Sequence, residues 1–558
     1  MIHTNRLQQI IRSEGQFIGS ANLPGLVRLV LVIAAFFFSA SICSASVTNV
    51  YIAQNSAGAA NGADCADAQA LSWFSNAANW GPGATQIGPG TTVHLCGTFI
   101  GSAGGQAISV NGSGSSGNPI TIKFETGANL TAPFWGGTST GAITIIGYNY
   151  IVVDGGVNGI IQNTDNGTGL GNHAASTGVV ISKASNITVK NLTIANICQH
   201  TSSADTSGCS TSGVGDEAFT FGGTSNVTIT RNTIHDTTQG IGYWWRATDS
   251  GNVISWNTIS RTNWGIASGG TGAATNALTV NGNDISCVVG AACNWNDNAD
   301  IFHHNGIMIY PQGSGNILQG VVISNNFIHD INTCTAGIFL DPGNSADVPN
   351  AQIFNNVFYT TPGQVGPSNA WIQPGAISSN PLVVNNTVIG PASQGIAVQI
   401  NPTIENNIVT LVGYGVVLNQ GYTTPSINYN DYYSNYSPSL ARMVADESSY
   451  NNFFDTVAAW TATYPTFDTH SITRNPNLTS GFMLNSGSPA IGAGKNLTSL
   501  GIAGLDVGAP QTFGVNGGCG TGCSPRPTSG PWDIGAYQTP GVASNQPNPA
   551  TALSATGH

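Results

Sequence analysis

The segments LTVNGNDI (278–285), VVISNNFI (321–328) and LVVNNTVI (382–389) share one pattern. Alternating apolar residues lead to an Asn, and two or three mostly β-branched or apolar residues follow it. Further copies lie at 187–194, 227–234, 253–259, 352–358, 403–409 and, more weakly, 426–433. The shared residues are Asn191, Asn232, Asn257, Asn283, Asn326, Asn356, Asn386, Asn407 and Asn430. Such a repeat predicts a solenoid, because one rung cannot bury its apolar face alone.

A second short strand, usually opened by Gly, follows most copies of the pattern. Examples are GIGYW (240–244), GIMIY (306–310) and GIAVQI (395–400). Most Asn-to-Asn intervals are 21–30 residues, which fits three short strands per turn and predicts an all-β, parallel solenoid. An Asn at one corner of every rung can hydrogen-bond to its copies above and below, forming an Asn ladder.

The composition excludes two broad classes of protein. The chain has 558 residues, 72 of them Gly, and only 7% are charged, with a net charge of −12. A helical protein would need many more charged residues on its solvent faces. A nucleic-acid-binding protein would need a basic stripe to neutralise phosphates, so we expect no nucleic-acid partner.

The rung pattern and its Asn ladder resemble the right-handed parallel β-helix, or pectate-lyase-like, superfamily. Segments at 89–100, 118–130 and 150–156 are similar to that superfamily's N-terminal rungs. LNSGSPAIGAG (484–494) and DIGAYQ (533–538) resemble a choice-of-anchor-like C-terminal segment of secreted bacterial β-helix proteins. The resemblance covers about residues 48–540 and implies a right-handed parallel β-helix with capped ends. It does not imply one chemistry, because this fold carries many functions.

The N-terminus has the pattern of a secretory signal peptide. Basic residues precede or enter the apolar run LVLVIAAFFF (29–38), and small residues follow it. The alternative is a retained membrane anchor, but ten apolar residues are few for a bilayer span. We therefore predict a secreted, extracellular or cell-surface protein. The predicted parts are a signal peptide at 1–45, a β-helix at 46–438, a C-terminal cap or accessory segment at 439–540 and a disordered tail at 541–558. Within 440–475 the spacing predicts a short helix or an irregular cap.

Export makes disulfides plausible for the cysteines of the mature chain. Short-range pairs suggest themselves: Cys65–Cys96, Cys198–Cys209, Cys287–Cys293 and Cys519–Cys523. Cys287–Cys334 is a rival pairing, which the sequence does not decide.

Two Asn-to-Asn intervals, of 41 and 43 residues, are longer than the others. The extra residues fall in the same part of the rung, at about 195–215 and 286–305, and each insertion contains a Cys pair. Since rungs stack about 4.8 Å apart, insertions three rungs apart would stand about 14 Å apart. We expect them to form the two walls of a cleft that admits a sugar chain. The resemblance also implies a substrate groove on this side.

The same side of the predicted solenoid carries many chemically reactive side chains. The predicted catalytic residues are His303, His304, Arg246, Arg261, Tyr310, Asp216, Glu217 and Asp236. The predicted substrate-binding residues are Trp244, Trp264, Trp295 and His235. Asp297 and Asp300 are candidate Ca²⁺ ligands, and no other cofactor is expected. His235–Asp236 and His329–Asp330 occupy one rung position, so structural repetition explains them as well as function does.

Three functions compete. A lyase on a uronate-containing polysaccharide needs a base, a group that neutralises the carboxylate and a proton donor. His303 or His304, Arg246 or Arg261, and Tyr310 would fill these roles. The superfamily's lyases commonly use a Lys or Arg base, whereas we expect no Lys in the groove region. A glycoside hydrolase needs two carboxylates, such as Asp216 or Glu217 with Asp236. The third function is a non-catalytic, polysaccharide-binding surface protein. We expect a monomer in each case.

Overall fold

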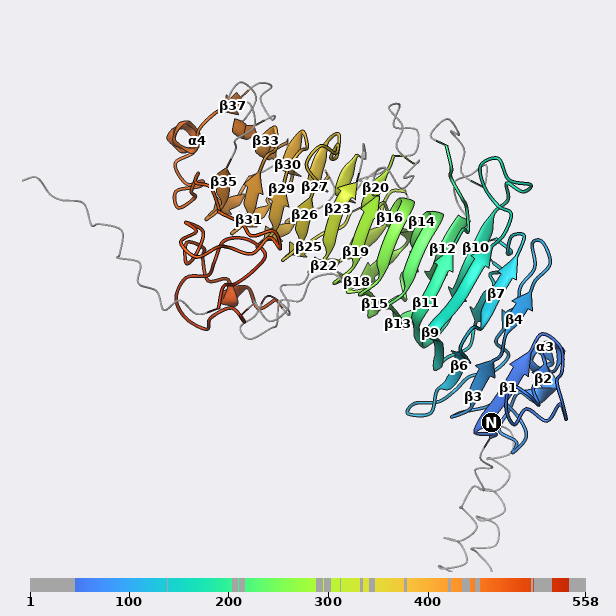
Figure 1. The fold of residues 1–558 in the computed structure, drawn as a ribbon. Coiled ribbons are helices and arrows are strands. Elements are labelled where there is room, and N and C mark those ends of the chain that lie inside the picture. Colours follow the sequence, from blue (N-terminus) through green and yellow to red (C-terminus); the bar gives the residue numbers. More distant parts are fainter. Residues whose placement is uncertain are drawn as a thin grey trace, which may run out of the picture. The chain divides into compact units, whose positions relative to one another are not determined.

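The computed structural model describes residues 46–137, 139–202, 209, 216–287, 295, 303–311, 313–331, 335–340, 347–375, 379–419, 423–433, 442–446, 452–502, 505 and 524–540. The predicted signal peptide at 1–45 and the predicted tail at 541–558 lie outside them. Within them the chain folds as a right-handed parallel β-helix, in which successive strands stack into parallel sheets (Figure 1). The predicted fold is therefore confirmed.

Three parallel sheets form the walls of the β-helix. Sheet 1 precedes the ladder corner and contains β1 (Asn49–Ala53), β3 (Thr92–Leu95), β6 (Ile120–Phe124), the first halves of β9 (Ile151–Asn163) and β11 (Ser185–Ala195), β13 (Ser225–Thr230), β15 (Asn252–Ser255), β18 (Leu278–Asn281), β22 (Val322–Ser324), β25 (Gln352–Phe354), β28 (Leu382–Val384), β31 (Thr403–Glu405) and β34 (Ser426–Asn428). Sheet 2 follows that corner and contains β4 (Thr98–Ile100), β7 (Asn129–Ala132), the second halves of β9 and β11, the first halves of β14 (Thr233–Arg246) and β16 (Thr258–Thr271), β19 (Asp284–Cys287), β23 (Phe327–Ile331), β26 (Val357–Tyr359), β29 (Thr387–Ile389), β32 (Ile408–Thr410) and β35 (Asp431–Tyr433).

Sheet 3 consists of the Gly-led strands and their neighbours. It contains β5 (Ile108–Ser109), β8 (Ile143–Ile146), β10 (Ser176–Ser182), β12 (Asp216–Gly222), the second halves of β14 and β16, β20 (Asn305–Ile309), β24 (Ala336–Leu340), β27 (Ala370–Pro374), β30 (Gln394–Val398), β33 (Tyr414–Leu418) and β36 (Arg442–Asp446). Alternate residues of these strands point inward and pack in register along the axis. One such fully buried row is Ile241, Ile266, Ile307, Ile338, Ile372 and Ile396. This interior is a packed apolar core that holds the rungs together.

The Asn ladder runs through eight rungs at the corner between sheets 1 and 2. In its middle, the Nδ2 of Asn326 donates to the Oδ1 of Asn356, and the Nδ2 of Asn356 donates to the Oδ1 of Asn386, both at 3.0 Å. The ladder residues are Asn232, Asn257, Asn283, Asn326, Asn356, Asn386, Asn407 and Asn430, all buried. Each side chain thereby satisfies buried groups of its neighbours.

Asn191 is not part of the ladder, contrary to the sequence prediction. Thr193 pairs with Thr233, so Leu192 occupies the position opposite Asn232. Asn191 instead has a left-handed backbone, with φ 59°, as does Arg231 with φ 56°. Asn tolerates both the ladder position and the left-handed position beside it, so the repeat alone did not fix the register of this rung.

Both ends of the β-helix are covered, as predicted. At the N-terminal end, the short strand β2 (Gln69–Ala70) pairs with β1 and leads into α3 (Leu71–Ser75). At the other end, β37 (Asn452–Phe454) pairs antiparallel with β36, and α4 (Val457–Thr463) follows. Trp460 of α4 is fully buried against the core. No helix in the described part of the chain is long and apolar enough to cross a bilayer.

The disulfides Cys65–Cys96 and Cys198–Cys209 are both present, which confirms two predicted pairs. Cys287 is also disulfide-bonded. Its two predicted partners, Cys293 and Cys334, lie outside the described residues, as does the predicted pair Cys519–Cys523. The choice between the two partners of Cys287 therefore stays open.

Candidate functional site

A pocket of about 330 Å³ opens on the outer face of sheet 3, where β10, β12 and β14 end. Outward side chains of these strands form its floor, and Trp244 forms one wall. The lining residues are Val180, Ile181, Ser182, Lys183, Thr220, Phe221, Gly222, Gly223, Trp244 and Arg246. The floor is apolar or uncharged and the rim carries two cations, which suits a ligand that combines an apolar face with a negative charge.

Lys183 and Arg246 stand on either side of Gly223. A Cβ atom at Gly223 would lie 3.8 Å from the Cγ of Lys183 and 3.9 Å from the Cγ of Arg246. Both side chains are exposed, and within the described residues the guanidinium of Arg246 donates to the carbonyl of Trp245, at 3.1 Å. Across the part of the chain that the structure describes, neither cation forms an ion pair with a carboxylate. Two uncompensated cations at one pocket favour an anionic ligand.

The turn that presents Gly223 is fixed by a buried acid. Asp249 accepts hydrogen bonds from the backbone amides of Gly223, at 3.1 Å, and Thr224, at 2.8 Å. Burial raises the pKa of Asp249 above its ordinary value. Asp249 is 3% exposed, so it supports the pocket from within and does not line it.

Trp244 joins the pocket to an acid and a phenol. Its indole nitrogen donates to Glu217 at 3.2 Å, and the Glu217 carboxylate lies over Gly242, where a Cβ would come within 2.9 Å of its carboxyl carbon. On the other side, across Gly269, the ring of Trp244 meets Tyr310 edge to face, with centroids 6.0 Å apart. Glycine at 242 and 269 therefore leaves the space in which these three side chains meet.

The phenol of Tyr310 is held in its protonated form. Burial, and then the negative charge of Glu217, raise the pKa of Tyr310 above its ordinary value. A tyrosine with a raised pKa remains a proton donor at neutral and mildly alkaline pH.

The aromatic side chains continue along the axis, from rung to rung. Trp264 lies 5.7 Å from Tyr310 by ring centroids, and its indole nitrogen donates to the carbonyl of His303 at 2.8 Å. The imidazole of His303 stacks on Phe339 at 5.1 Å. Five predicted residues, Glu217, Trp244, Trp264, His303 and Tyr310, are thus brought together on the outer face of sheet 3. Arg246 lies at its edge, in the pocket.

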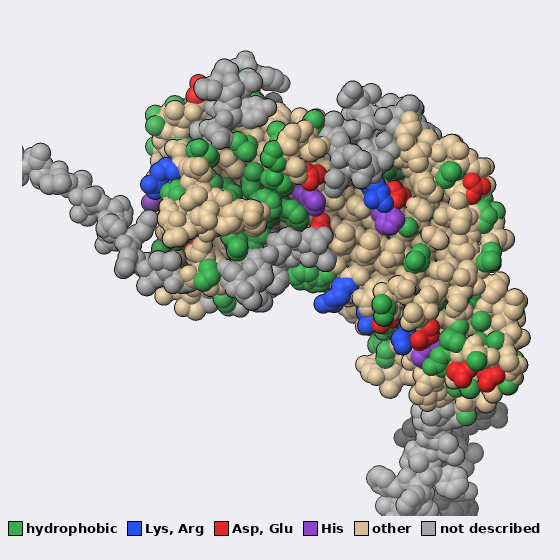
Figure 2. Space-filling model, viewed as in Figure 1, with side chains coloured by type: hydrophobic (Ala, Val, Ile, Leu, Met, Phe, Trp, Pro, Cys, Tyr) green, Lys and Arg blue, Asp and Glu red, His purple; other side chains and the backbone are tan. Residues whose placement is uncertain are grey.

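His235, Asp236 and Arg261 form a separate cluster at the corner between sheets 2 and 3. His235 Nδ1 lies 2.6 Å from Asp236, and Arg261 Nε donates to the other carboxylate oxygen at 2.8 Å. Burial opposes ionisation of Asp236, but hydrogen bonds from Arg261 and His235 outweigh it and lower its pKa to about 2. The His329–Asp330 copy behaves likewise: its imidazole lies between Asp284 and Asp330, each at 3.0 Å. Figure 2 shows that charged side chains are sparse and gather in such small groups.

The two insertions are joined, and they do not stand apart as two walls. His200 of the first stacks on Trp295 of the second, with centroids 4.1 Å apart and an interplanar angle of 14°. Trp295 also packs with Cys198, Cys209 and Cys287 in one buried cluster. The predicted separation of about 14 Å between the insertions is therefore wrong at these described residues, because side chains of the two insertions are in contact there.

Two predicted site residues do not fit their roles. Trp295 is only 1% exposed, which leaves no ring face for a sugar, and His304 is 4% exposed.

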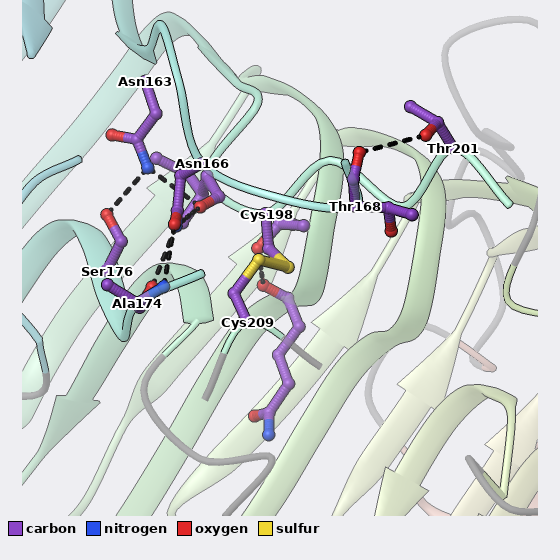
Figure 3. The surroundings of a disulfide bond; sticks show 11 residues. Asn163, Asn166, Thr168, Ala174, Ser176, Cys198, Thr201 and Cys209 are labelled. Atoms are coloured by element: carbon purple, nitrogen blue, oxygen red, sulfur yellow. Dashed lines mark hydrogen bonds between the residues drawn. A yellow bond between two sulfur atoms is a disulfide. The ribbon is translucent and has the colours of Figure 1, made fainter. Parts of the chain in front are cut away.

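The turn before β10 supports the joined insertions (Figure 3). Asn163 and Asn166 both donate to the carbonyl of Ile197, at 2.8 Å, next to the Cys198–Cys209 disulfide.

The predicted metal ligands are Asp297 and Asp300. Both lie outside the described residues, and the side chain of Asp216 does as well. Among the described residues, no group of three or more His, Cys, Asp or Glu side chains is arranged to hold a metal ion.

Lys183 is a candidate site residue that sequence reasoning missed: the sequence predicted no Lys in the groove region, whereas Lys183 lines this pocket. The sequence does contain a signal for this residue, because GVVIS (178–182), just before Lys183, fits the Gly-led strand pattern. In the structure this strand lies in the same sheet: Val180 pairs with Thr220, and Thr220 pairs with Gly242. Extending the series by this strand would have placed Lys183 beside the end of β12.

No protein-family model matches the chain, and no curated protein matches it. Among solved structures, it is similar to the crystal structure of pectate lyase Pel9A, with 13% identity, 89% of this chain and 98% of that chain covered, and a TM-score of 0.39. It is also similar to GH136 lacto-N-biosidase from Eubacterium ramulus, with 13% identity, 72% and 67% coverage and a TM-score of 0.38. A third structure is the periplasmic alginate epimerase AlgG, with 14% identity, 59% and 74% coverage and a TM-score of 0.31.

Proposed function

We propose that this protein is a secreted polysaccharide lyase, which binds a uronate-containing polysaccharide on the outer face of sheet 3 and cleaves it by β-elimination. One observation carries the proposal: Lys183 and Arg246, without carboxylate partners among the described residues, flank a pocket walled by Trp244. The chain is acidic overall, with a net charge of −12. An acidic polymer therefore needs a local cationic site to bind at all.

The pocket offers one partner for each part of a uronate ring. Arg246 remains protonated at any physiological pH, and its planar guanidinium matches a carboxylate. The half-exposed indole of Trp244 offers an apolar face to the ring's C–H groups, while its nitrogen is held by Glu217. Ser182 and Thr220 line the same pocket and can hydrogen-bond to sugar hydroxyls.

β-Elimination then needs a base and an acid. We assign Lys183 as the base that takes the C5 proton, because an amine gives up its own proton more readily than a guanidinium does. Arg246 stabilises the negative charge that develops on the carboxylate. The electron pair of the C5–H bond forms the C4–C5 double bond, and the C4–O bond breaks. Tyr310, on the far side of Trp244, is the candidate donor to the leaving oxygen, since its raised pKa keeps it protonated. Lys183 thus takes the role of base that the sequence predicted for His303 or His304. We propose that His303 binds the sugar chain instead.

Hydrolysis is the second candidate, because Glu217 places a carboxylate behind the pocket wall, but this residue is 0% exposed and so is as buried as the rejected His304. The predicted partner of Glu217, Asp236, is a poor general acid. Both of its oxygens are engaged by Arg261 and His235, and its pKa is about 2. A raised pKa is what a general acid requires.

Three further proposals complete this function. Two disulfides among the described residues support export with removal of residues 1–45. We propose that Asp297 and Asp300 supply oxygen ligands to Ca²⁺, which would help an acidic protein to hold an acidic polymer. We also propose that the protein acts as a monomer, since both ends of its β-helix are covered.

The test is to mix the mature protein with polygalacturonate, alginate and hyaluronate, and to follow both ultraviolet absorbance and new reducing ends. The lyase predicts both signals together, since elimination leaves an unsaturated uronate at one new end. Reducing ends without absorbance would show hydrolysis. Retention of a polymer without either signal would show a binding protein, and no effect of any kind would refute a role with acidic polysaccharides.

A further inference from the structure

Lys183 stands at a corner of the β-helix where both neighbouring rungs have glycine. The strands β8, β10 and β12 end in register, so the residues that follow them, Gly147, Lys183 and Gly223, are equivalent. All three have a left-handed backbone, with φ 77°, 50° and 65°. Gly adopts this backbone freely, whereas a residue with a side chain is strained in it. Such a strained residue persists only where the surrounding contacts hold its backbone in place.

A chain of hydrogen bonds holds this corner and ends at Arg246. The amide of Lys183 donates to the carbonyl of Gly222 at 3.3 Å. The next amide, that of Gly223, donates to Oδ2 of Asp249 at 3.1 Å, and the amide of Asp249 donates to the carbonyl of Arg246 at 3.0 Å. Asp249 thus links the backbone beside Lys183 to the backbone of Arg246.

The carboxylate of Asp249 uses both of its oxygens in this corner. While Oδ2 accepts from Gly223, Oδ1 accepts from the amide of Thr224 at 2.8 Å. The buried phenol of Tyr243 also hydrogen-bonds to Asp249. Because the backbone partners are both N–H donors, an asparagine at this position would turn its NH2 group toward a donor and lose one of the two bonds.

We propose that Asp249 is a positioning residue of the lyase: it fixes the spacing between Lys183 and Arg246, so that the base and the carboxylate-binding group engage the same sugar ring. The inference rests on the proposed function, because it assigns a role within that reaction. Asp249 is 3% exposed and lies outside the pocket lining, so it acts on the substrate only through the two cations. Catalysis then depends on the geometry of the corner as well as on its charge.

The test is a double-mutant cycle of Asp249→Asn and Lys183→Ala, followed by ultraviolet absorbance with polygalacturonate and alginate. Asp249→Asn alone is expected to lower kcat about 10- to 100-fold with a smaller change in KM, because both cations remain but the base is displaced. In the Lys183→Ala background the same substitution should lower kcat clearly less, since no spacing between the two cations is left to disturb. Losses that add up in full would overturn the positioning role.

Loss of the acidic charge does not by itself explain such a result. Removing one negative charge from the protein favours an acidic polymer, so a charge effect alone would raise activity.

Asp533→Asn is the matched control. Asp533 is 1% exposed and, like Asp249, accepts from two backbone amides, with Gly492 on Oδ1 and Thr539 on Oδ2, both at 2.8 Å. It lies outside the pocket lining. Asp533→Asn should lose stability as Asp249→Asn does, but it should keep the kcat per folded molecule and the KM of the unaltered protein.

The outcomes separate this inference from the proposed function. If Asp249→Asn cleaves as fast as the unaltered protein while Lys183→Ala does not, the positioning role is wrong and the proposed function stands. If Asp533→Asn loses as much kcat as Asp249→Asn, the effect is a general loss of stability and the positioning role is again overturned. If the unaltered protein cleaves no acidic polymer, both proposals fail.

Melting temperatures show whether each variant is folded. Should Asp249→Asn not fold, Tyr243→Phe provides a milder change, because it removes one hydrogen bond to Asp249 and keeps the buried ring. This variant should also lower kcat more than it raises KM, and an unchanged kcat would contradict the positioning role.

Discussion

The indole nitrogen of Trp244 donates a hydrogen bond to Oε1 of Glu217 at 3.2 Å, although the two residues belong to different rungs. This bond couples the wall of the pocket to the environment of Tyr310, whose pKa is raised by burial and by the Glu217 charge. A substitution at Glu217 should therefore alter both sugar binding and proton transfer.

Replacing Glu217 with Gln tests the link to Tyr310. The amide oxygen can still accept from Trp244, but the charge is lost, so the pKa of Tyr310 should fall. Since the proton donor is active when protonated, the alkaline limb of the pH–kcat profile should move to lower pH. The profile of Glu217→Gln beside that of the unaltered protein is the measurement. An unmoved limb would exclude Tyr310 as the donor, and Tyr310→Phe should abolish the limb.

Removing either cation from the pocket should impair cleavage of an acidic polymer. Loss of a hydrogen bond to a charged group costs about 1.5–3 kcal/mol, or roughly a 10- to 150-fold loss in kcat/KM. Arg246→Ala is expected to act mainly on KM and Lys183→Ala mainly on kcat, because one binds and the other accepts the proton. Arg231→Ala is the control, since Arg231 is an exposed arginine at another corner. Equal effects of Arg231→Ala and Arg246→Ala would mean that only net charge matters.

The His235–Asp236–Arg261 cluster should stabilise the fold in a pH-dependent way. The pKa of Asp236 falls from 3.8 to about 2 on folding, so its ionised form stabilises the protein above about pH 4. That contribution, about 2 kcal/mol, is lost as the pH falls through 2. Asp236→Asn should therefore be less stable than the unaltered protein at pH 6, and the difference should vanish near pH 2. Urea unfolding at both pH values measures it; a difference independent of pH would exclude the ionised carboxylate as its source.

The ladder should tolerate apolar substitution at its end better than in its middle. Leu192 already occupies the ladder position in the rung before Asn232. Asn356→Leu leaves buried groups of two neighbouring rungs unsatisfied and should cost about 3 kcal/mol or more. Asn232→Leu should cost less, because the oxygen of Asn232 accepts only from the Leu192 amide, whereas that of Asn356 accepts from both the amide and the side chain of Asn326. Thermal unfolding of both variants measures the two losses of stability. Equal losses would mean that the number of ladder hydrogen bonds does not determine the loss of stability.

Calcium dependence follows from the candidate ligands Asp297 and Asp300. Treatment with a chelator is expected to reduce polymer cleavage, and added Ca²⁺ should restore it. The Asp297→Asn/Asp300→Asn double variant should lose its response to both. Calcium binding measured directly by calorimetry gives a readout that does not depend on activity, and no binding would refute the site.

The fold could be predicted because its signal is repeated. Eight ladder residues and a stacked Ile row fix the period, and each copy supports the others. The first rung was misaligned by one residue because Asn fits both the ladder and the adjacent left-handed position, as Asn191 shows. A periodic pattern gives the number of rungs more reliably than the register of a rung at its edge.

The site was only partly predictable, because its geometry depends on contacts outside the repeat. Alternation placed Trp244 and Tyr310 on the outer face, and both are there. The stacking of His200 on Trp295 joins two insertions with no shared sequence pattern, so this contact could not be predicted from the repeat. Lys183 and Arg246 are 63 residues apart in sequence, and only the stacking of β10, β12 and β14 brings them to one pocket.

The proposed lyase recognises a uronate carboxylate and eliminates beside it. The most direct measurement compares polygalacturonate with the same polymer after chemical reduction of its carboxylates to alcohols, at equal chain length. We expect absorbance and reducing ends to rise with the uronate polymer, and neither to rise with the reduced polymer. Cleavage of the reduced polymer at a comparable rate would contradict this expectation, because the two cations of the pocket would then have no carboxylate to bind.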